Sequence, residues 1–505
     1  MTVFSLRRSG GCIVLAALLI PFILPVLALL AGLVHTPELL RNSPLAARLP
    51  RVIVNTISLA MFSGMTALVL GGLSGVLAGR ASPRARLFAV GIFFAVFAVP
   101  SHVHAVGLTT LAFLWPRVDA VLYSFGGAVL VLGWLTSPFP FFAAYAAARS
   151  WPDEWEDAAL LDGGYRRTWI YLWLPLVFRP AFVGACLAAA LVFGDFSVPD
   201  ILFSRDPGKF AVFSTEVQTA AGAFFDLPLA SRLGSLFALI PLAAAVFIVV
   251  QARRLVDLRP LQAADGGATP SIAWRRFRGG QDPAAVICAL VAAFPLAVSL
   301  AVPAWMLFRD SGALGIILKS AGDEILFSVL LCGGCALLIT LAGAVASGFA
   351  ADSRFGKTLG LRGVLLLLAG ASALLYILPG TLTGVYVAGV FSLSWLRPLN
   401  ETILPLAVFY LLKGPGAAWP LILYAAMTAP TDVIEAALMD GCGFWRRIRH
   451  ALAPPCFRFW AAGFALAFLT LLAESAGSVI VSAPGRTPLA VRIQTVMHYG
   501  PSGYV

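Results

Sequence analysis

Long apolar runs constrain this chain more than any other feature. Eleven stretches of about 20 or more mostly apolar residues follow one another, each long enough for a helix that crosses a bilayer. The chain is 60% hydrophobic and 12% charged, about half the charged fraction of an average soluble domain. Backbone groups inside a bilayer must bond within their own segment, so we predict an all-α, polytopic transmembrane protein. The runs lie at about 11–33, 52–78, 87–113, 124–148, 180–203, 232–252, 284–307, 324–350, 363–391, 402–427 and 458–481.

A short polar helix is written twice between these runs, in loops at 150–180 and 428–458. The first copy reads D-A-A-L-L-D-G over 157–163 and the second E-A-A-L-M-D-G over 435–441. Ser150 and Pro152 are suited to the start of the first helix, and Gly163 and Gly441 are placed to end the two copies. The paired alanines leave one face nearly without side chains, so we interpret each helix as a docking element.

The two halves of the chain keep a nearly constant register. Pro100 corresponds to Pro379 and Asp195 to Glu474, both pairs 279 positions apart. We therefore predict two parallel repeats of about six helices. The expected domains are 1–252, a basic and glycine-rich linker at 253–283, and 284–505, in which five spans are visible. In this register no twelfth span precedes the end of the given sequence, and the sequence does not decide why.

The doubled helix, with the basic residues and the proline that follow each copy, resembles the cytoplasmic loop of binding-protein-dependent ABC importer permeases. Two copies in one chain are similar to the fused double permeases of the ferric iron and thiamine group. The resemblance implies a type I importer in which each loop is a coupling helix seated in an ATPase. The first copy departs from the pattern, because Asp157 replaces the glutamate and the following proline comes one residue earlier. The coupling residues implied are Asp157, Ala158, Ala159, Asp162, Gly163, Glu435, Ala436, Ala437, Asp440 and Gly441.

The resemblance also implies partners and a location. The partners are a cytoplasmic ATPase dimer that binds ATP and a periplasmic substrate-binding protein, and the location is the bacterial inner membrane. Lys and Arg concentrate on the loops that share a side with the N-terminus, which predicts a cytoplasmic N-terminus and lipid rather than nucleic acid as the partner of the +11 net charge. Phe355-Gly356-Lys357-Thr358 is similar to the end of a phosphate-binding loop, but Ala351 stands where that loop needs glycine. We expect no cofactor on this chain and no enzymatic activity.

Five polar residues in the apolar runs are candidates for the translocation pathway. Carboxylates within a membrane normally face protein or water, so Asp195 and Glu474 either contact a cationic substrate or cap a kinked helix. Lys413 stands beside Gly414-Pro415-Gly416, where we expect a broken helix that exposes backbone carbonyls to the ammonium group, a salt bridge to Glu474, or a kink with the side chain at the surface. The remaining two are His102 and His104, which follow Pro100.

No metal site is predicted. His102 and His104 have no evident third ligand, so we interpret them as polar residues of the pathway. Cys332 and Cys335 have redox spacing, but they lie within an apolar run and are interpreted as small buried residues. Ferric iron is the expected substrate, with thiamine or another small solute next. A secondary transporter and, less well, a membrane enzyme are the rival interpretations, and neither explains two matched docking helices.

Overall fold

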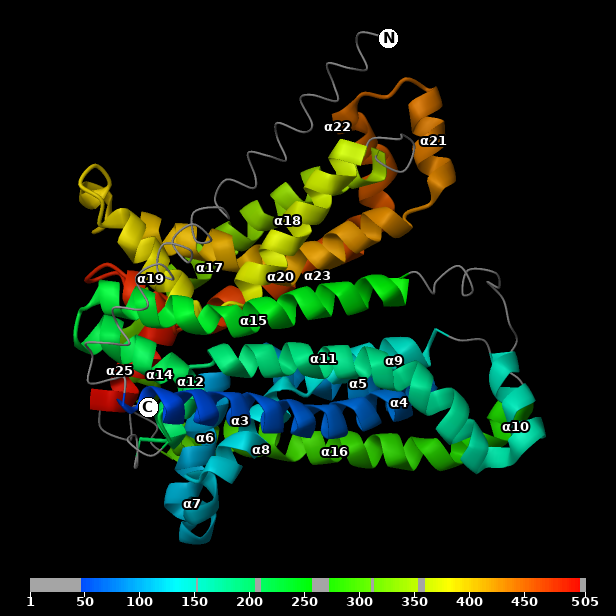
Figure 1. The fold of residues 1–505 in the computed structure, drawn as a ribbon, viewed down its shortest axis with the longest axis horizontal. Coiled ribbons are helices and arrows are strands. Elements are labelled where there is room, and N and C mark those ends of the chain that lie inside the picture. Colours follow the sequence, from blue (N-terminus) through cyan, green and yellow to red (C-terminus); the bar gives the residue numbers. More distant parts are fainter. Residues whose placement is uncertain are drawn as a thin grey trace. The chain divides into compact units, whose positions relative to one another are not determined.

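The computed structural model of the chain describes residues 47–150, 153–204, 210–256, 272–309, 313–352 and 359–499. The regular secondary structure in these ranges is helical, and no strand occurs in them (Figure 1). The all-α prediction is therefore confirmed. The described residues form two compact units, which we call the N-terminal unit (residues 43–216 and 239–314) and the C-terminal unit (217–238 and 315–505).

The N-terminal unit is built mainly from the first half of the chain. Several of its helices adjoin without a loop, and two π-helical turns, η2 and η3, lie within long helices. Its elements are α3 (Leu49–Ala67), η2 (Leu68–Gly72), α4 (Leu73–Arg80), α5 (Pro83–Ala98), α6 (Ser101–Leu114), α7 (Pro116–Leu122), α8 (Phe125–Thr136), α9 (Pro138–Ala148), α10 (Asp153–Thr168), η3 (Trp169–Trp173), α11 (Leu174–Gly194), α12 (Ser197–Leu202), most of α14 (Phe213–Gln218), the end of α15 (Leu227–Val256) and α16 (Ile272–Arg309).

The C-terminal unit repeats much of this plan. Its buried core is one continuous cluster that includes Leu375, Phe409, Tyr410, Trp419 and Leu471. Its elements are η4 (Thr219–Ala223), the start of α15, α17 (Ala313–Asp352), α18 (Leu359–Ile377), α19 (Gly380–Phe391), η6 (Arg397–Leu399), α20 (Leu404–Thr428), α21 (Thr431–Met439), α22 (Phe444–Arg447), η7 (Ile448–Leu452), α23 (Ala453–Ala473), α24 (Ser478–Val481) and α25 (Leu489–Tyr499).

The predicted spans agree with the helices in number. Within the described residues seven helices are long and apolar enough to cross a membrane, and three bent helix pairs raise the total to ten. Each of these ten corresponds to one predicted run. The eleventh prediction, at 11–33, lies outside the described residues.

Bending is where the spans differ from the predictions. The runs expected at 87–113 and 363–391 are not straight: α6 turns 93° from α5, and α19 turns 107° from α18. Pro100 and Pro379 are the N-cap residues at these corners, where a proline ring cannot continue the preceding helix. The matched prolines therefore redirect the chain in both halves.

The first helix of the second half packs within the N-terminal unit. α16 lies against α4, α5 and α6. Asp282 accepts a 2.7 Å hydrogen bond from the Ser82 backbone N–H, and Trp134 Nε1 donates to the Ala292 carbonyl at 3.0 Å. α15 and α16 also extend into the segment predicted as a basic and glycine-rich linker, of which 257–271 lies outside the described residues. The basic residues from Arg275 to Arg278 thus belong to a helix.

Small residues bring the helices of the N-terminal unit close together. Gly71, Gly75 and Gly79 recur every four residues and face α9, where an added Cβ would collide with backbone atoms or with Ala148. Such close approach increases the van der Waals contact that holds helices together in lipid. The stripe fixes the helix that leads to the first polar loop.

Candidate functional site

The first polar helix, α10, is one residue longer than the sequence suggests. Its backbone is interrupted at Gly164, which has φ 65° and ψ −178°, and not at the predicted Gly163. Tyr165 then resumes helical structure directly, because the loop after this copy is short. The Ser150 hydroxyl donates back to the Ala147 carbonyl at 2.8 Å, and Pro152 lies outside the described residues.

The second polar helix, α21, ends as predicted. Asp440 is its C-cap residue, and Gly441 has a φ of 67°, the left-handed conformation that only glycine adopts without strain. Cys442 and the extended Gly443 follow before α22 begins. The two loops therefore differ in how the chain leaves the helix, which matches the difference in spacing seen in the sequence.

Both helices expose apolar side chains at the same positions. Leu161 on α10 and Met439 on α21, which are 278 residues apart, are each 88% exposed. Trp155 and Val433, related by the same offset, are also exposed. A large apolar side chain left almost bare at one position is unremarkable, but its repetition on two polar helices indicates a surface that another protein covers.

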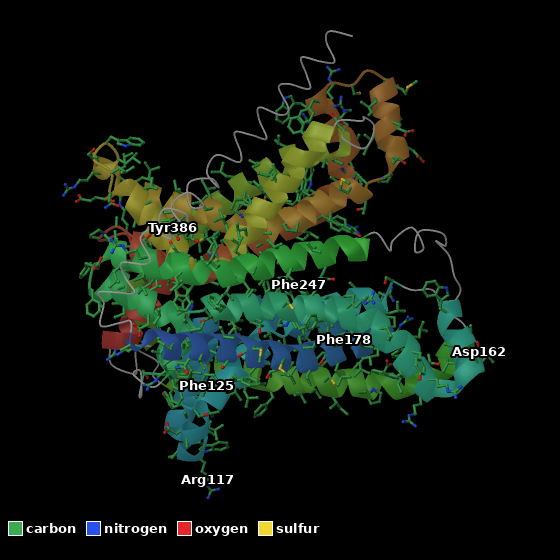
Figure 2. All side chains as sticks on the ribbon, in the orientation of Figure 1. Arg117, Phe125, Asp162, Phe178, Phe247 and Tyr386 are labelled. Atoms are coloured by element: carbon green, nitrogen blue, oxygen red, sulfur yellow. The ribbon has the colours of Figure 1, made fainter. Side chains whose placement is uncertain are left out.

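The predicted coupling residues lie on or beside this surface. Ala158, Asp162, Glu435, Ala436, Asp440 and Gly441 are exposed, and Asp157, Ala159, Gly163 and Ala437 are partly exposed. Figure 2 shows Asp162 on α10, at the end of the N-terminal unit. All ten are thus placed where a partner can reach them, and their coupling role stays a prediction.

An ion pair fixes the second polar loop to its unit. Arg447 at the end of α22 lies 2.5 Å from Asp352 at the end of α17, and it also donates to the Cys442 carbonyl at 2.7 Å. Phe444 stacks on Phe349 with ring centroids 4.6 Å apart. Sequence reasoning missed these residues, because nothing in the sequence pairs an aspartate with an arginine 95 positions away.

A long helix leads from each polar loop to a carboxylate. The helix over Arg166–Gly194 has 29 residues and the one over Phe444–Ala473 has 30. Each contains a five-residue π-helical turn at a matched position, η3 and η7. At about 1.5 Å per residue each helix is about 44 Å long, enough to carry a displacement across the membrane.

Asp195 and Glu474 are the residues at which these helices end. We expected them inside the spans, but each is the C-cap residue of α11 or α23. The Asp195 carboxylate accepts from the Val198 N–H at 3.0 Å, and the Glu474 carboxylate accepts from the Gly477 N–H at 3.2 Å. Of the two interpretations offered by the sequence, these contacts support capping of a kinked helix.

The short helices after the carboxylates pack on the bent segments. α12 contacts α6 in the N-terminal unit, and α24 contacts α19 in the C-terminal unit. Glu474 lies so close to Gly380 that a side chain at Gly380 would overlap its carboxylate. A negative charge at the start of α19 is favourable, since the first N–H groups of a helix carry partial positive charge. Each long helix thus ends against the corner made by its matched proline.

Lys413 completes the corner in the C-terminal unit. Its side chain is only 5% exposed, and Nζ donates to the carbonyls of Leu375, Tyr376 and Leu378 at 3.2, 3.3 and 2.5 Å. These carbonyls lie at the end of α18, where the bend leaves them without helical partners.

The predictions for Lys413 were therefore wrong in two respects. α20 continues through Gly414-Pro415-Gly416, so the helix is not broken there, and the side chain does not reach the surface. The carbonyls that it binds belong to another helix. Among the described residues no ion pair joins Lys413 to Glu474.

His102 and His104 lie in the first turn of α6 and are both buried. The ring of His104 hydrogen-bonds to Ser299 on α16 at 2.7 Å and packs edge-on against Trp134. No group of three or more His, Cys, Asp or Glu suited to a metal occurs in the parts of the chain that the structure describes. Cys332 and Cys335 are buried in α17 and form no disulfide.

Comparison with known proteins agrees with this arrangement. The family model described as "binding-protein-dependent transport system inner membrane component" matches the chain twice, over residues 71–261 and 343–498. No curated protein and no solved structure matched the chain. The two family matches cover more than half of the chain, and each includes one polar helix and one carboxylate turn. The chain therefore belongs to the inner membrane components of binding-protein-dependent transport systems, with two permease repeats fused in a single ABC importer subunit.

Proposed function

We propose that this chain couples ATP hydrolysis on a separate ATPase to solute passage across the membrane. The observation that carries the proposal is the matched exposure of Leu161 and Met439 on two polar helices. Two equivalent grooves, one on each ATPase subunit of a dimer, would cover the two apolar side chains. The chain itself contributes no catalytic group, and a periplasmic binding protein delivers the substrate.

The long helices suggest how the coupling works. When the ATPase dimer closes, α10 and α21 move with it, and the rigid helices that follow displace the turns at Asp195 and Glu474. These turns pack through α12 and α24 on α6 and α19, the segments bent at Pro100 and Pro379. A shift at the polar loops therefore alters the corners that border the pathway.

Ferric iron is the substrate that we propose, with thiamine or another small solute as the alternative. The fusion of two permease repeats and the matched carboxylates support a cationic substrate. The capping contacts of Asp195 and Glu474 reduce the part that these carboxylates play in recognition, so specificity rests more with the binding protein. The proposed location is the bacterial inner membrane, with the N-terminus and both polar loops in the cytoplasm.

The test compares docking with transport. The parent chain, purified in detergent from its source membranes, should retain an ATPase, and the purified complex should hydrolyse ATP. The double variant Leu161→Asp/Met439→Asp should lose both, because two buried charges would face the grooves. Phe224→Asp is the matched control, since Phe224 is exposed but lies outside the polar helices.

The results separate the importer from its rival. An ATPase retained by the double variant would contradict docking through α10 and α21. Solute uptake by the parent in vesicles without any ATPase would instead support a secondary transporter. For the substrate, ferric iron uptake that thiamine does not inhibit would support the iron assignment, and the reverse would contradict it.

A further inference from the structure

Each unit carries an exposed tryptophan and arginine at the end opposite its polar helix. In the N-terminal unit these are Trp115 and Arg117, and in the C-terminal unit Trp395 and Arg397, so the pattern W-x-R occurs twice. Trp115 is 66% exposed and Trp395 is 73% exposed, and both arginines are exposed. We call these two pairs the W-x-R tips. Neither the family match nor the coupling mechanism accounts for them.

The backbone places both tips at the level where spans begin and end. α5 ends at Ala98 and α8 begins at Phe125, so the residues between them connect two membrane crossings. α6 turns 93° from α5, and α7 and α8 meet at 83°. α6 packs on α16 and α12 within the unit, and Trp115 and Arg117 follow at its far end, where the chain turns back toward α8. Figure 1 shows α7 projecting from the side of the N-terminal helices, and Figure 2 shows Arg117 pointing away at its end.

The second tip has the same origin. α19 turns 107° from α18, and it ends at Phe391 just before Trp395. With 14 residues in α6 and 12 in α19, each segment carries its tip about 20 Å sideways from the corner. Each tip is thus exposed beyond a buried segment, at the end of its unit away from the polar helix, where lipid headgroups can contact it.

The chemistry of the tips fits this position. Exposed apolar residues accompany both tryptophans, Leu114 and Val121 in one unit and Leu393 and Leu399 in the other. Water alone would leave these side chains uncovered, whereas the acyl chains just below the headgroups would cover them. Tryptophan is the residue most suited to this boundary, because its ring is apolar and its N–H is polar.

The arginines select the kind of lipid. Neither Arg117 nor Arg397 forms an ion pair with any carboxylate among the described residues. A guanidinium beside an interfacial tryptophan binds a phosphate with two parallel hydrogen bonds. We propose that each W-x-R tip is a binding site for an anionic phospholipid headgroup, which anchors the far ends of the bent segments α6 and α19 at the membrane surface.

The anchor also has a consequence for transport, which rests on the proposed coupling to an ATPase. α6 and α19 pack on the turns at Asp195 and Glu474. Lipid bound at the tips holds the far ends of these segments while the long helices move the near ends. The lipid contact thus supplies the fixed point against which the corners bend.

The experiment measures lipid affinity by native mass spectrometry of the full chain in detergent. Phosphatidylglycerol is the anionic probe, and phosphatidylcholine is the zwitterionic comparison. Arg117→Gln and Arg397→Gln should each weaken phosphatidylglycerol binding at one site about fivefold, as expected for the loss of one basic residue at a lipid surface. Phosphatidylcholine binding should not change. Arg486→Gln is the matched control, because Arg486 is exposed after α24 but has no neighbouring tryptophan.

Three outcomes would overturn the proposal. The double variant Arg117→Gln/Arg397→Gln could bind phosphatidylglycerol as the parent does, or Arg486→Gln could lose as much affinity. In the third outcome, the double variant keeps its lipid but loses the ATP hydrolysis that the binding protein stimulates. This result would assign the tips to a protein partner.

A second measurement leaves the charges untouched. Phosphatidylcholine brominated near its headgroup should quench the tryptophan fluorescence of the parent in nanodiscs more than that of Trp115→Phe/Trp395→Phe. Equal quenching would place the tips outside the bilayer surface. Neither lipid binding nor fluorescence quenching needs an ATPase, so failure of these two measurements leaves the proposed function standing.

Discussion

The Lys413 ammonium group donates a 2.5 Å hydrogen bond to the carbonyl of Leu378, the residue directly before the corner at Pro379. Two further carbonyls of α18 share the same ammonium group. A bend of 107° leaves these carbonyls without helical partners inside the protein, and one lysine from α20 satisfies them. Lys413 is thus a structural residue of the corner.

Lys413→Met should destabilise the chain without any effect on the docking surface. The side-chain volume is nearly retained, but three buried carbonyls lose a charged donor. Hydrogen bonds to charged groups contribute about 1.5–3 kcal/mol in soluble proteins, and bonds between membrane helices contribute less, so we expect a loss of about 1–3 kcal/mol. The apparent melting temperature in detergent measures it. Lys319→Met is the control, because Lys319 is exposed, and an equal loss there would contradict the assignment.

The Asp352–Arg447 pair should couple the second polar loop to α17. Both side chains are partly buried, at 29% and 12% exposure, so the pair is stronger than one on an open surface. In a double-mutant cycle with Asp352→Asn and Arg447→Gln we expect a coupling energy of about 1–2 kcal/mol. Hydrogen exchange should rise over residues 441–452 in each single variant. If the double variant loses as much free energy of unfolding as the two single variants added together, the pair does not anchor the loop.

The two polar loops each contain one glycine of positive φ, and both should resist substitution. Gly441→Ala and Gly164→Ala introduce a Cβ into a backbone with φ near 65°, which costs about 1–2 kcal/mol. Nothing lies within 4 Å of the added Cβ at either position, so steric contact does not contribute. Gly443→Ala is the control, because Gly443 has equally open space and an ordinary φ of −64°. Thermal unfolding of all three variants distinguishes them, and a loss at Gly443 equal to that at Gly441 would rule out the conformational explanation.

Glu216 should make stability depend on pH. Burial raises the pKa of Glu216 above its usual 4.5, and the positive charge of Arg48 partly opposes the shift. A carboxyl with a raised pKa binds its proton more tightly in the folded chain, so stability falls as pH rises from about 4.5 through the raised pKa. Above that pKa the loss is complete and the curve is level.

The variant Glu216→Gln should lack this part of the pH dependence, which thermal unfolding across the acidic range can measure. Arg48→Gln should enlarge it, because the opposing charge is gone. A parent whose stability rises with pH over the same window would show that other groups dominate.

Sequence patterns predicted the membrane helices and the repeated loop well, since both depend on local composition. Ten predicted runs have a counterpart among the described helices, and the stop at Gly441 was placed correctly. The stop at Gly163 was one residue early, because two glycines stand together and the sequence does not show which of them takes the left-handed conformation.

What depends on contacts between distant segments could not be predicted. The carbonyls bound by Lys413 lie 35 to 38 residues away, and the direction taken after Pro100 or Pro379 depends on packing. For Asp195 and Glu474 the sequence offered capping of a kinked helix as one of its interpretations. The sequence does not show which backbone N–H groups the two carboxylates contact, and these contacts decide between capping and substrate contact.

The position of α16 has a consequence for how the protein is made. Ser82 and Asp282 are joined by a hydrogen bond although 200 residues separate them. During synthesis the surfaces of α4, α5 and α6 that α16 covers emerge from the ribosome long before α16 does. The surfaces of the N-terminal unit that contact α16 therefore stay uncovered until synthesis has reached the second repeat. A gene cut at 257–271 would give a first fragment that lacks its own last helix, so the two fragments should become stable only when produced together.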